Sequence, residues 1–305
     1  VADLVTFMLY INNFTDPIKR LVSFTEQFQN GASGYERFLE IMNVEPDIVD
    51  DKHAVDVGTL QGDISFKNVM FHYVDTDTNV LSNLTLDIKA GEYVALVGSS
   101  GAGKTTMVKL LMRFYDVNSG EIKLDGHNLK DYNRNELRNA FGMVLQDTWL
   151  FKGSIMENIR YGRLDATDEE VIAAAKSAHA HHFIKTLPGG YDFELNEEAS
   201  NVSAGQRQLL TIARAILADN PVMILDEATS SVDTRTEHRI QRAMDNLMKG
   251  RTSFVIAHRL STIKNADIIL VMKDGDIIEQ GSHEELMAKK GFYADLYNSQ
   301  FAKTA

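Results

Sequence analysis

The fold is decided by the stretch Gly98-Ser99-Ser100-Gly101-Ala102-Gly103-Lys104-Thr105. An apolar run at 93–97 precedes it and is typical of a buried strand, and the residues from Thr106 onward are typical of the start of a helix. A loop of the pattern GxxxxGK, followed by Ser or Thr, between a strand and a helix binds nucleotide phosphates. Its glycines let backbone N–H groups surround the phosphates, and the helix N-terminus adds partial positive charge.

Three side chains at the end of this loop have expected roles. Lys104 would reach the β- and γ-phosphates, and Thr105 would hold Mg²⁺. Thr106 follows directly and is included among the expected nucleotide-binding residues. The alternative is an ordinary glycine turn, which the strand before the loop and the helix after it argue against.

The composition is that of an ordinary globular protein. The chain has 305 residues, of which 44% are hydrophobic and 24% are charged, which suits one or two domains with a sizeable core. Its formal net charge of −12 excludes a general binder of polyanions, so we expect no nucleic-acid partner and a phosphate affinity confined to the loop. The absence of cysteine excludes disulfides and fits a reducing compartment.

The first 45 residues are expected to be helical, because apolar residues recur near helical spacing after Pro17. The apolar run at 1–11 is too short to cross a bilayer, which takes about 20 residues. It is either the end of a transmembrane helix or part of a soluble amphipathic helix. Residues 46–60 are polar and are expected to form a linker, and residues 61–305 the main domain.

The main domain is expected to mix strands and helices. Helical segments are expected at 133–140 and at 153–218, the latter broken near Pro188, and a C-terminal helical tail should run from a capping box at Ser282 to about Asn298. Strands are expected at residues 64–71, 80–88, 93–97, 120–124, 142–145, 222–225, 252–256, 267–272 and 276–279.

Two adjacent carboxylates, Asp226 and Glu227, end the apolar strand at 222–225. In an enzyme with a phosphate loop, Asp226 would help to hold Mg²⁺, and Glu227 would polarise the attacking water. Alternation along a strand points the two side chains in different directions, which suits one metal partner and one water partner. The alternative is a carboxylate pair that faces solvent.

Three further side chains follow strands. Gln146 lies at a carboxyl-terminal strand edge, where it could touch Mg²⁺ or the attacking water, or serve as an ordinary hydrogen-bonding loop residue. His258 could donate to the γ-phosphate and orient Glu227 or the water. Tyr73 lies in a polar loop and could stack on an adenine ring, or be a structural tyrosine at the end of a strand.

The segment Asn201-Val202-Ser203-Ala204-Gly205-Gln206 precedes a strongly amphipathic run. Ser203 is a good N-cap, and with Gly205 in the first turn the helix presents an N-terminus that can receive a phosphate. Taken alone, the segment could equally be an ordinary capped helix.

Taken in order, these features resemble the nucleotide-binding domain of ATP-binding cassette (ABC) transporters over roughly residues 60–300: the phosphate loop, Gln146, Ser203 to Gln206, Asp226-Glu227, Ser231-Val232-Asp233 and His258. The resemblance implies an α/β fold: a P-loop NTPase cassette with a mixed sheet core, an antiparallel β subdomain and an inserted helical subdomain at about 150–218. Its ligands would be ATP and Mg²⁺.

The resemblance also implies roles for single residues. Tyr73 corresponds to the aromatic that stacks on adenine, and Gln146 to the loop that senses the transmembrane domain. The signature segment, with Ser203, Gly205 and Gln206, would lie against the ATP held by a second ABC subunit, and Asp233 would join the two sites. Two such domains would enclose two ATP molecules, as a homodimer or a heterodimer.

Residues 1–45 resemble the last transmembrane helix of an exporter, in which membrane and nucleotide domains share one chain. The expected function is therefore ATP hydrolysis that powers export, by a domain on the cytoplasmic face of a multi-pass membrane protein. The alternatives are a non-transport ABC ATPase of the DNA-repair or translation type, and the regulatory half of a heterodimeric transporter.

Some residues depart from the family pattern. Val202 and Ala204 stand where Leu and Gly are commonest, and Val232 departs from the usual Ser-Ala-Leu-Asp. The segment 196–200 replaces a glycine-rich stretch. The altered signature leaves open a heterodimer in which only one ATP site is fully competent.

Overall fold

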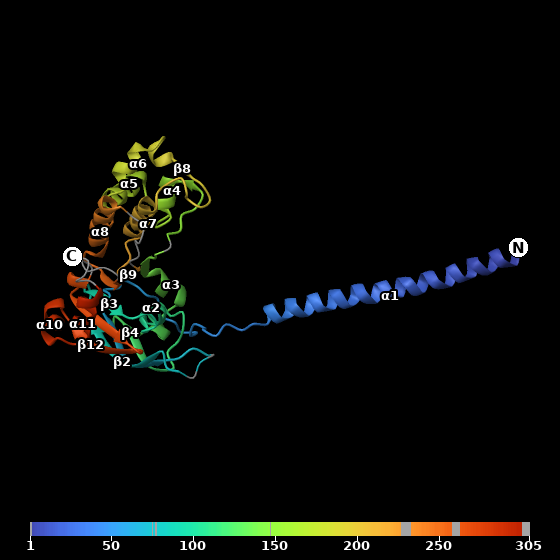
Figure 1. Ribbon diagram of the computed structural model, residues 1–305, viewed down its shortest axis with the longest axis horizontal. Helices are drawn as coiled ribbons and strands as arrows, with labels where there is room; N and C mark the ends of the chain where they lie inside the picture. Colours follow the sequence, from blue (N-terminus) through green and yellow to red (C-terminus); the bar gives the residue numbers. More distant parts are fainter. Residues whose placement is uncertain are drawn as a thin grey trace. The chain divides into compact units, whose positions relative to one another are not determined.

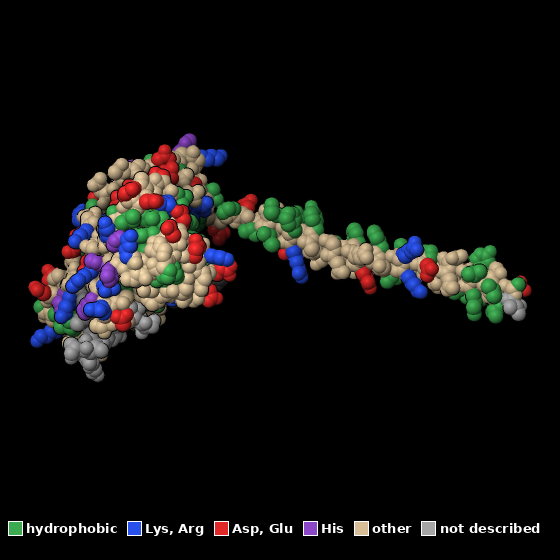
Figure 2. All heavy atoms as spheres, turned by 90° about the horizontal axis from the view of Figure 1, so that it is seen from above, with side chains coloured by type: hydrophobic (Ala, Val, Ile, Leu, Met, Phe, Trp, Pro, Cys, Tyr) green, Lys and Arg blue, Asp and Glu red, His purple; other side chains and the backbone are tan. Residues whose placement is uncertain are grey.

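The computed structural model describes residues 2–74, 76, 78–146, 148–226, 233–257 and 263–300. The chain divides into two compact units, Val1–Val49 and Asp50–Ala305. The first unit contains one helix, α1 (Ala2–Met42), none of whose described residues is buried (Figure 1). Hydrophobic side chains line much of this helix in Figure 2. Within the described residues, no helix combines the length and the apolar character that a membrane span needs.

A six-stranded sheet forms the centre of the second unit (Figure 1). Its strand order is β12-β11-β3-β10-β9-β6, and all neighbours are parallel except β12, which is antiparallel to β11. The expected mixed sheet core is therefore confirmed. The strands are β3 (Tyr93–Gly98), β6 (Phe141–Val144), β9 (Val222–Asp226), β10 (Thr252–Ile256), β11 (Ile268–Lys273) and β12 (Asp276–Gly281).

A second, antiparallel sheet has the order β2-β1-β4-β5. Helix α2 (Lys104–Leu111) shares a hydrophobic core with it, because Met107 and Leu110 belong to the same buried cluster as Leu84 and Leu86. This sheet confirms the expected antiparallel subdomain. Its strands are β1 (Ile64–Phe71), β2 (Leu81–Ile88), β4 (Ser119–Leu124) and β5 (His127–Asn128).

The helical subdomain has a core that it shares with residues of β6, β9 and β10 of the central sheet, and it is more interrupted than expected. A capping box at Thr167 starts one helix anew, and His179, at a φ of 55°, follows the end of that helix. The elements are β7 (Gly153–Ser154), α4 (Ile155–Arg160), α5 (Asp168–Ser177), α6 (His181–Thr186), η2 (Gly190–Asp192), β8 (Glu194–Leu195) and α7 (Ala204–Ala218).

The expected C-terminal helical tail with its capping box at Ser282 is present, but it consists of more than one helix. The structure has two, α10 (His283–Lys289) and α11 (Phe292–Gln300). Lys290 ends the first in the left-handed conformation. The Glu279 carboxylate of β12 accepts hydrogen bonds from the backbone N–H groups of Phe292 and Tyr293, which caps the second.

Three further elements complete the described part: η1 (Leu129–Asp131), α3 (Arg134–Asn139) and α8 (Thr234–Met248). Helix α3 agrees with the expected helix at 133–140. Helix α8 is absent from the sequence-based expectations, although its buried residues recur at helical spacing: Ile240, Ala243, Met244 and Leu247.

The end of α2 is closed by Arg113, whose φ is 51°. The Phe114 N–H donates to the Lys109 carbonyl, and the Arg113 N–H donates to the Leu110 carbonyl, each at 2.9 Å, which is a Schellman motif. The buried Arg113 guanidinium lies 3.3 Å from a carboxylate oxygen of Asp50 and of Asp116. This pairing holds the helix end in place.

We expect Arg113→Met to lower the free energy of unfolding by about 2 kcal/mol, because it removes a buried cation together with its ion pairs to Asp50 and Asp116. Urea denaturation measures the change. Arg235→Met, at an exposed position on α8, is the control and should stay within about 0.5 kcal/mol of the parent. Equal stabilities for the two variants would contradict the role of the Arg113 pairing.

Candidate nucleotide-binding site

The loop between β3 and α2 approaches neighbouring atoms so closely that two of its positions admit only glycine. A Cβ at Gly98 would lie 2.3 Å from the Met272 carbonyl oxygen, and one at Gly103 would lie 2.8 Å from Leu81 Cδ2. Gly103 also has a φ of 102° and stands at the N-cap of α2, where its lack of a side chain leaves the helix N-terminus open. The backbone can therefore form a phosphate cradle.

The remaining loop residues differ in exposure. Ser99, Ser100, Gly101 and Thr105 are exposed, so their polar groups are accessible to a ligand. Ala102 and Thr106 are buried against the core. The exposed members thus face solvent while the buried members anchor the loop.

Lys104 lies across the loop. Its Nζ donates to the carbonyl oxygens of Gly98, at 2.7 Å, and Ser99, at 2.9 Å. Burial lowers the pKa of Lys104, and the Asp226 carboxylate opposes that shift. The ammonium group therefore contacts the loop backbone and feels the charge of Asp226 at the end of β9.

The parallel register brings other polar residues to the same edge of the sheet. Leu225 pairs with Val144, and Asp226 pairs with Ile256, which in turn pairs with Leu96. The carboxyl ends of β3, β10, β9 and β6 therefore meet at one edge, which carries the phosphate loop and Asp226. Gln146 lies two residues beyond the end of β6 at this edge and is exposed.

Several expected site residues lie outside the described residues: Glu227, Ser231, Val232 and His258. By chain position, Glu227 directly follows Asp226, and His258 comes two residues after the end of β10. Their roles stay predictions from the sequence.

Tyr73 contacts the helix that follows the phosphate loop. Its hydroxyl oxygen lies 3.1 Å from Thr106 Oγ1, within hydrogen-bonding distance. Its ring is half-buried and packs edge-to-face against Phe71, with ring centroids 5.0 Å apart. The structure thus brings Tyr73 and the phosphate loop together.

The signature segment, residues 201–206, begins helix α7 and does not pack in the same hydrophobic cluster as the phosphate loop. Ser203 caps α7 in a capping box: its Oγ accepts from the Gln206 N–H at 3.2 Å, and the Gln206 side chain accepts from the Ser203 N–H at 2.9 Å. Gly205 is buried in the first turn. The helix packs in the core of the helical subdomain, whereas the phosphate loop packs in the core beneath the antiparallel sheet. The expected N-cap is confirmed.

Asp233 caps α8, because its Oδ1 accepts a hydrogen bond from the Thr236 N–H at 3.0 Å. Hydrogen bonds to Thr236 lower the pKa of this carboxyl group. Its carboxylate thus has a local structural task in addition to any contact with a ligand.

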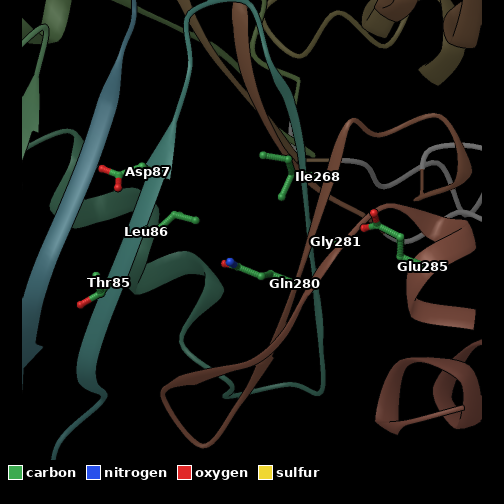
Figure 3. Close-up of a pocket in the computed structure, with 7 residues that line it drawn as sticks. All are labelled: Thr85, Leu86, Asp87, Ile268, Gln280, Gly281 and Glu285. Carbon is green, nitrogen blue, oxygen red and sulfur yellow. The ribbon is translucent and has the colours of Figure 1, made fainter. Parts of the chain in front are cut away.

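A separate pocket of about 500 Å³ lies between β2 and β12 (Figure 3). The side chains of Leu86 and Gln280 point toward one another across it, while Asp87 and Glu285 also line it. Among the described residues, its lining has two carboxylates and no lysine or arginine, so it does not suit a triphosphate.

A glycine cradle between a strand and a helix, a lysine across it, and an aspartate at the end of a neighbouring parallel strand define a P-loop nucleotide-binding protein. Residues 81–230 match the family model described as ABC transporter. The chain belongs to this ABC transporter family.

The similar proteins agree on this class. An uncharacterized ABC transporter ATP-binding protein, YfiC of Bacillus subtilis, is 49% identical over 99% of this chain and 50% of its own length. An ATP-dependent lipid A-core flippase of Syntrophus aciditrophicus is 46% identical over 97% of this chain and 49% of its own. A solved bacterial Atm1-family ABC exporter with ATP bound has a TM-score of 0.82 and 40% identity, covering 91% of this chain and 48% of that one. The chain thus spans about half the length of these relatives.

Proposed function

We propose that this chain binds and hydrolyses ATP with Mg²⁺ and that this reaction powers export by a longer membrane transporter. The observation that carries the proposal is Lys104, which lies across the glycine loop at the sheet edge that also holds Asp226. The exporter relatives support the direction of transport.

In this proposal, the loop N–H groups from Gly98 to Thr105 hold the phosphates, and Lys104 neutralises the β- and γ-phosphates. Thr105, Gln146 and Asp226 would hold Mg²⁺, which supplies charge stabilisation of the phosphates. Oxygen-bearing side chains suit this hard cation.

The attacking water would be activated at the same edge. Glu227 would polarise this water, and His258 would orient it and donate to the γ-phosphate. Preorganised charge around the phosphates should supply most of the rate.

A second subunit would complete each site. Ser203, Gly205 and Gln206 would lie against the ATP of the partner, with Asp233 between the two sites. In support, α7 presents a capped N-terminus and packs in a different hydrophobic cluster from the phosphate loop of the same chain. We propose that ATP closes the pair, as a homodimer or as one half of a heterodimer, and that hydrolysis reopens it.

In this proposal, the partner of the cassette in the membrane is a transmembrane domain on the same polypeptide. We propose that residues 1–45 continue its transmembrane domain, that residues 46–60 link them to the cassette, and that the cassette works on the cytoplasmic face. Relatives named ATP-binding/permease proteins support this arrangement, such as the fatty acid transporter of Mycobacterium bovis, 46% identical over 96% of this chain.

The test measures ATP turnover by the 305-residue chain at rising protein concentration, with and without Mg²⁺. A site shared by two chains predicts that the rate per chain rises with concentration until the dimer saturates. A Mg²⁺-independent rate, or one that is constant per chain from the lowest concentration while the chain is monomeric, would contradict the proposal. Stimulation by nucleic acid would favour the non-transport ATPase.

We expect Ser203→Asp to weaken ATP-dependent dimerisation by about tenfold or more, because it places a negative charge where the partner's phosphate should bind. Aspartate is as good an N-cap as serine, so thermal stability should be unchanged. Sedimentation with ATP measures the dimer. Ser203→Ala is the matched variant: it should lose about 1 kcal/mol of stability but dimerise better than the aspartate variant. Equal dimerisation by the two variants would contradict the proposed contact between Ser203 and the partner's ATP.

A further inference from the structure

Tyr115 makes an aromatic contact with Tyr73, and the proposed nucleotide site assigns no role to it. Its ring centroid lies 5.2 Å from that of Tyr73, with an interplanar angle of 87°. It also lies 5.6 Å from the ring of Phe71, which itself contacts Tyr73. Three rings from two distant parts of the chain therefore form one cluster.

The two ends of α2 both hold Tyr73. Thr106, in the first turn, lies within hydrogen-bonding distance of its hydroxyl. Tyr115, just beyond the Schellman turn at the other end, packs on its ring. The orientation of Tyr73 is thus tied to the helix that also carries the phosphate loop.

Tyr115 has a rigid support of its own. The turn before it is fixed by Arg113, whose guanidinium donates to the Tyr132 carbonyl at 3.2 Å and whose own carbonyl accepts from Arg138 at 2.9 Å. Phe71, on the strand side of the cluster, is only 3% exposed. The ring of Tyr73 therefore packs against two anchored neighbours.

We propose that Tyr115 is a positioning residue for the nucleotide base: it holds the ring of Tyr73 in the orientation that stacks on adenine. This inference rests on the proposed adenine contact of Tyr73. Stacking needs a defined ring plane, and the ring contacts of Tyr73 with Phe71 and Tyr115 define one. Tyr115 itself does not contact the base.

The experiment compares two ligands that differ by the base and its ribose. ADP and inorganic pyrophosphate each displace a labelled ATP from the 305-residue chain, and the ratio of their dissociation constants isolates the contact with the nucleoside. Tyr115→Ala should weaken the binding of ADP by about two- to tenfold, the range expected for one edge-to-face pair, and leave the binding of pyrophosphate unchanged. Tyr115→Phe keeps the ring and should bind both like the parent.

Phe114→Ala is the matched control. Phe114 is 42% exposed, close to the 40% of Tyr115, but it packs under the Arg138 guanidinium at 4.8 Å. Phe114→Ala should leave the ratio of the two dissociation constants unchanged.

If Tyr73→Ala weakens the binding of ADP alone and Tyr115→Ala does not, the inference is overturned and the adenine contact stands. If Tyr73→Ala itself has no effect, the adenine contact falls and the inference with it. If Tyr115→Ala weakens both ligands equally, it acts on the loop and the inference is overturned.

Discussion

Lys104→Ala is expected to lower kcat/KM for ATP hydrolysis by about 10²- to 10³-fold, the loss typical for removal of one preorganised donor to a developing anion. The reason is visible in the loop. Lys104 Nζ lies against the Gly98 and Ser99 carbonyls of the cradle. Lys104 is the only positively charged residue in the sequence of this loop. Without it, only the backbone N–H groups and Mg²⁺ would neutralise the triphosphate. Steady-state kinetics and equilibrium binding of ATP measure the two parts of the effect.

Lys109→Ala is the matched control for this experiment. It removes the same group from the same helix, slightly more than one turn further along. Its hydrolysis rate should stay within about threefold of the parent, because a surface substitution away from the phosphates has a small effect. Parent-like ATP binding in Lys104→Ala would remove the phosphate loop from the mechanism.

Glu227→Gln is expected to lower the turnover number by about 10²- to 10⁴-fold, the contribution of a general base, with little change in ATP affinity. The amide keeps the size of the side chain but cannot accept a proton from water. Because hydrolysis reopens the proposed dimer, the variant should accumulate as a closed, ATP-bound pair. Gel filtration in ATP and Mg²⁺ should then show twice the mass that it shows in ADP.

The control is Glu169→Gln, at an exposed position in the first turn of α5, which should hydrolyse ATP like the parent. A parent-like rate in Glu227→Gln would exclude its role as base. If Glu227→Gln hydrolyses ATP slowly but remains monomeric in ATP, this result would count against an ATP site shared by two chains.

Much of the fold could be read from local patterns. The strands at 64–71 and 252–256 were predicted to the residue, because buried strands are short apolar or alternating runs. The N-cap at Ser203 was predicted because capping depends only on residues within one turn. The same local logic explains why Asp226 was placed at a strand end.

Other features were missed, some of them because they depend on partners distant in sequence. The break at Lys290 rests on Glu279, which caps the following helix from another strand. Helix α8 has a readable local signal in its N-cap Asp233 and its spaced apolar residues, although the sequence-based expectations include no helix there. Tyr115 had no local signal, since an exposed aromatic is common on protein surfaces.

By itself, the sequence determined that a glycine loop joins a strand to a helix and that carboxylate, amide and imidazole side chains follow other strands, because chain order and local periodicity suffice for both. Only the tertiary structure decided that the ends of β3 and β9 share an edge, that Lys104 interacts with Asp226 there, and that Tyr73 is held at both ends of α2. The physical reason is that strand order and ring contacts join residues far apart in the chain, which side-chain packing selects and no short stretch encodes.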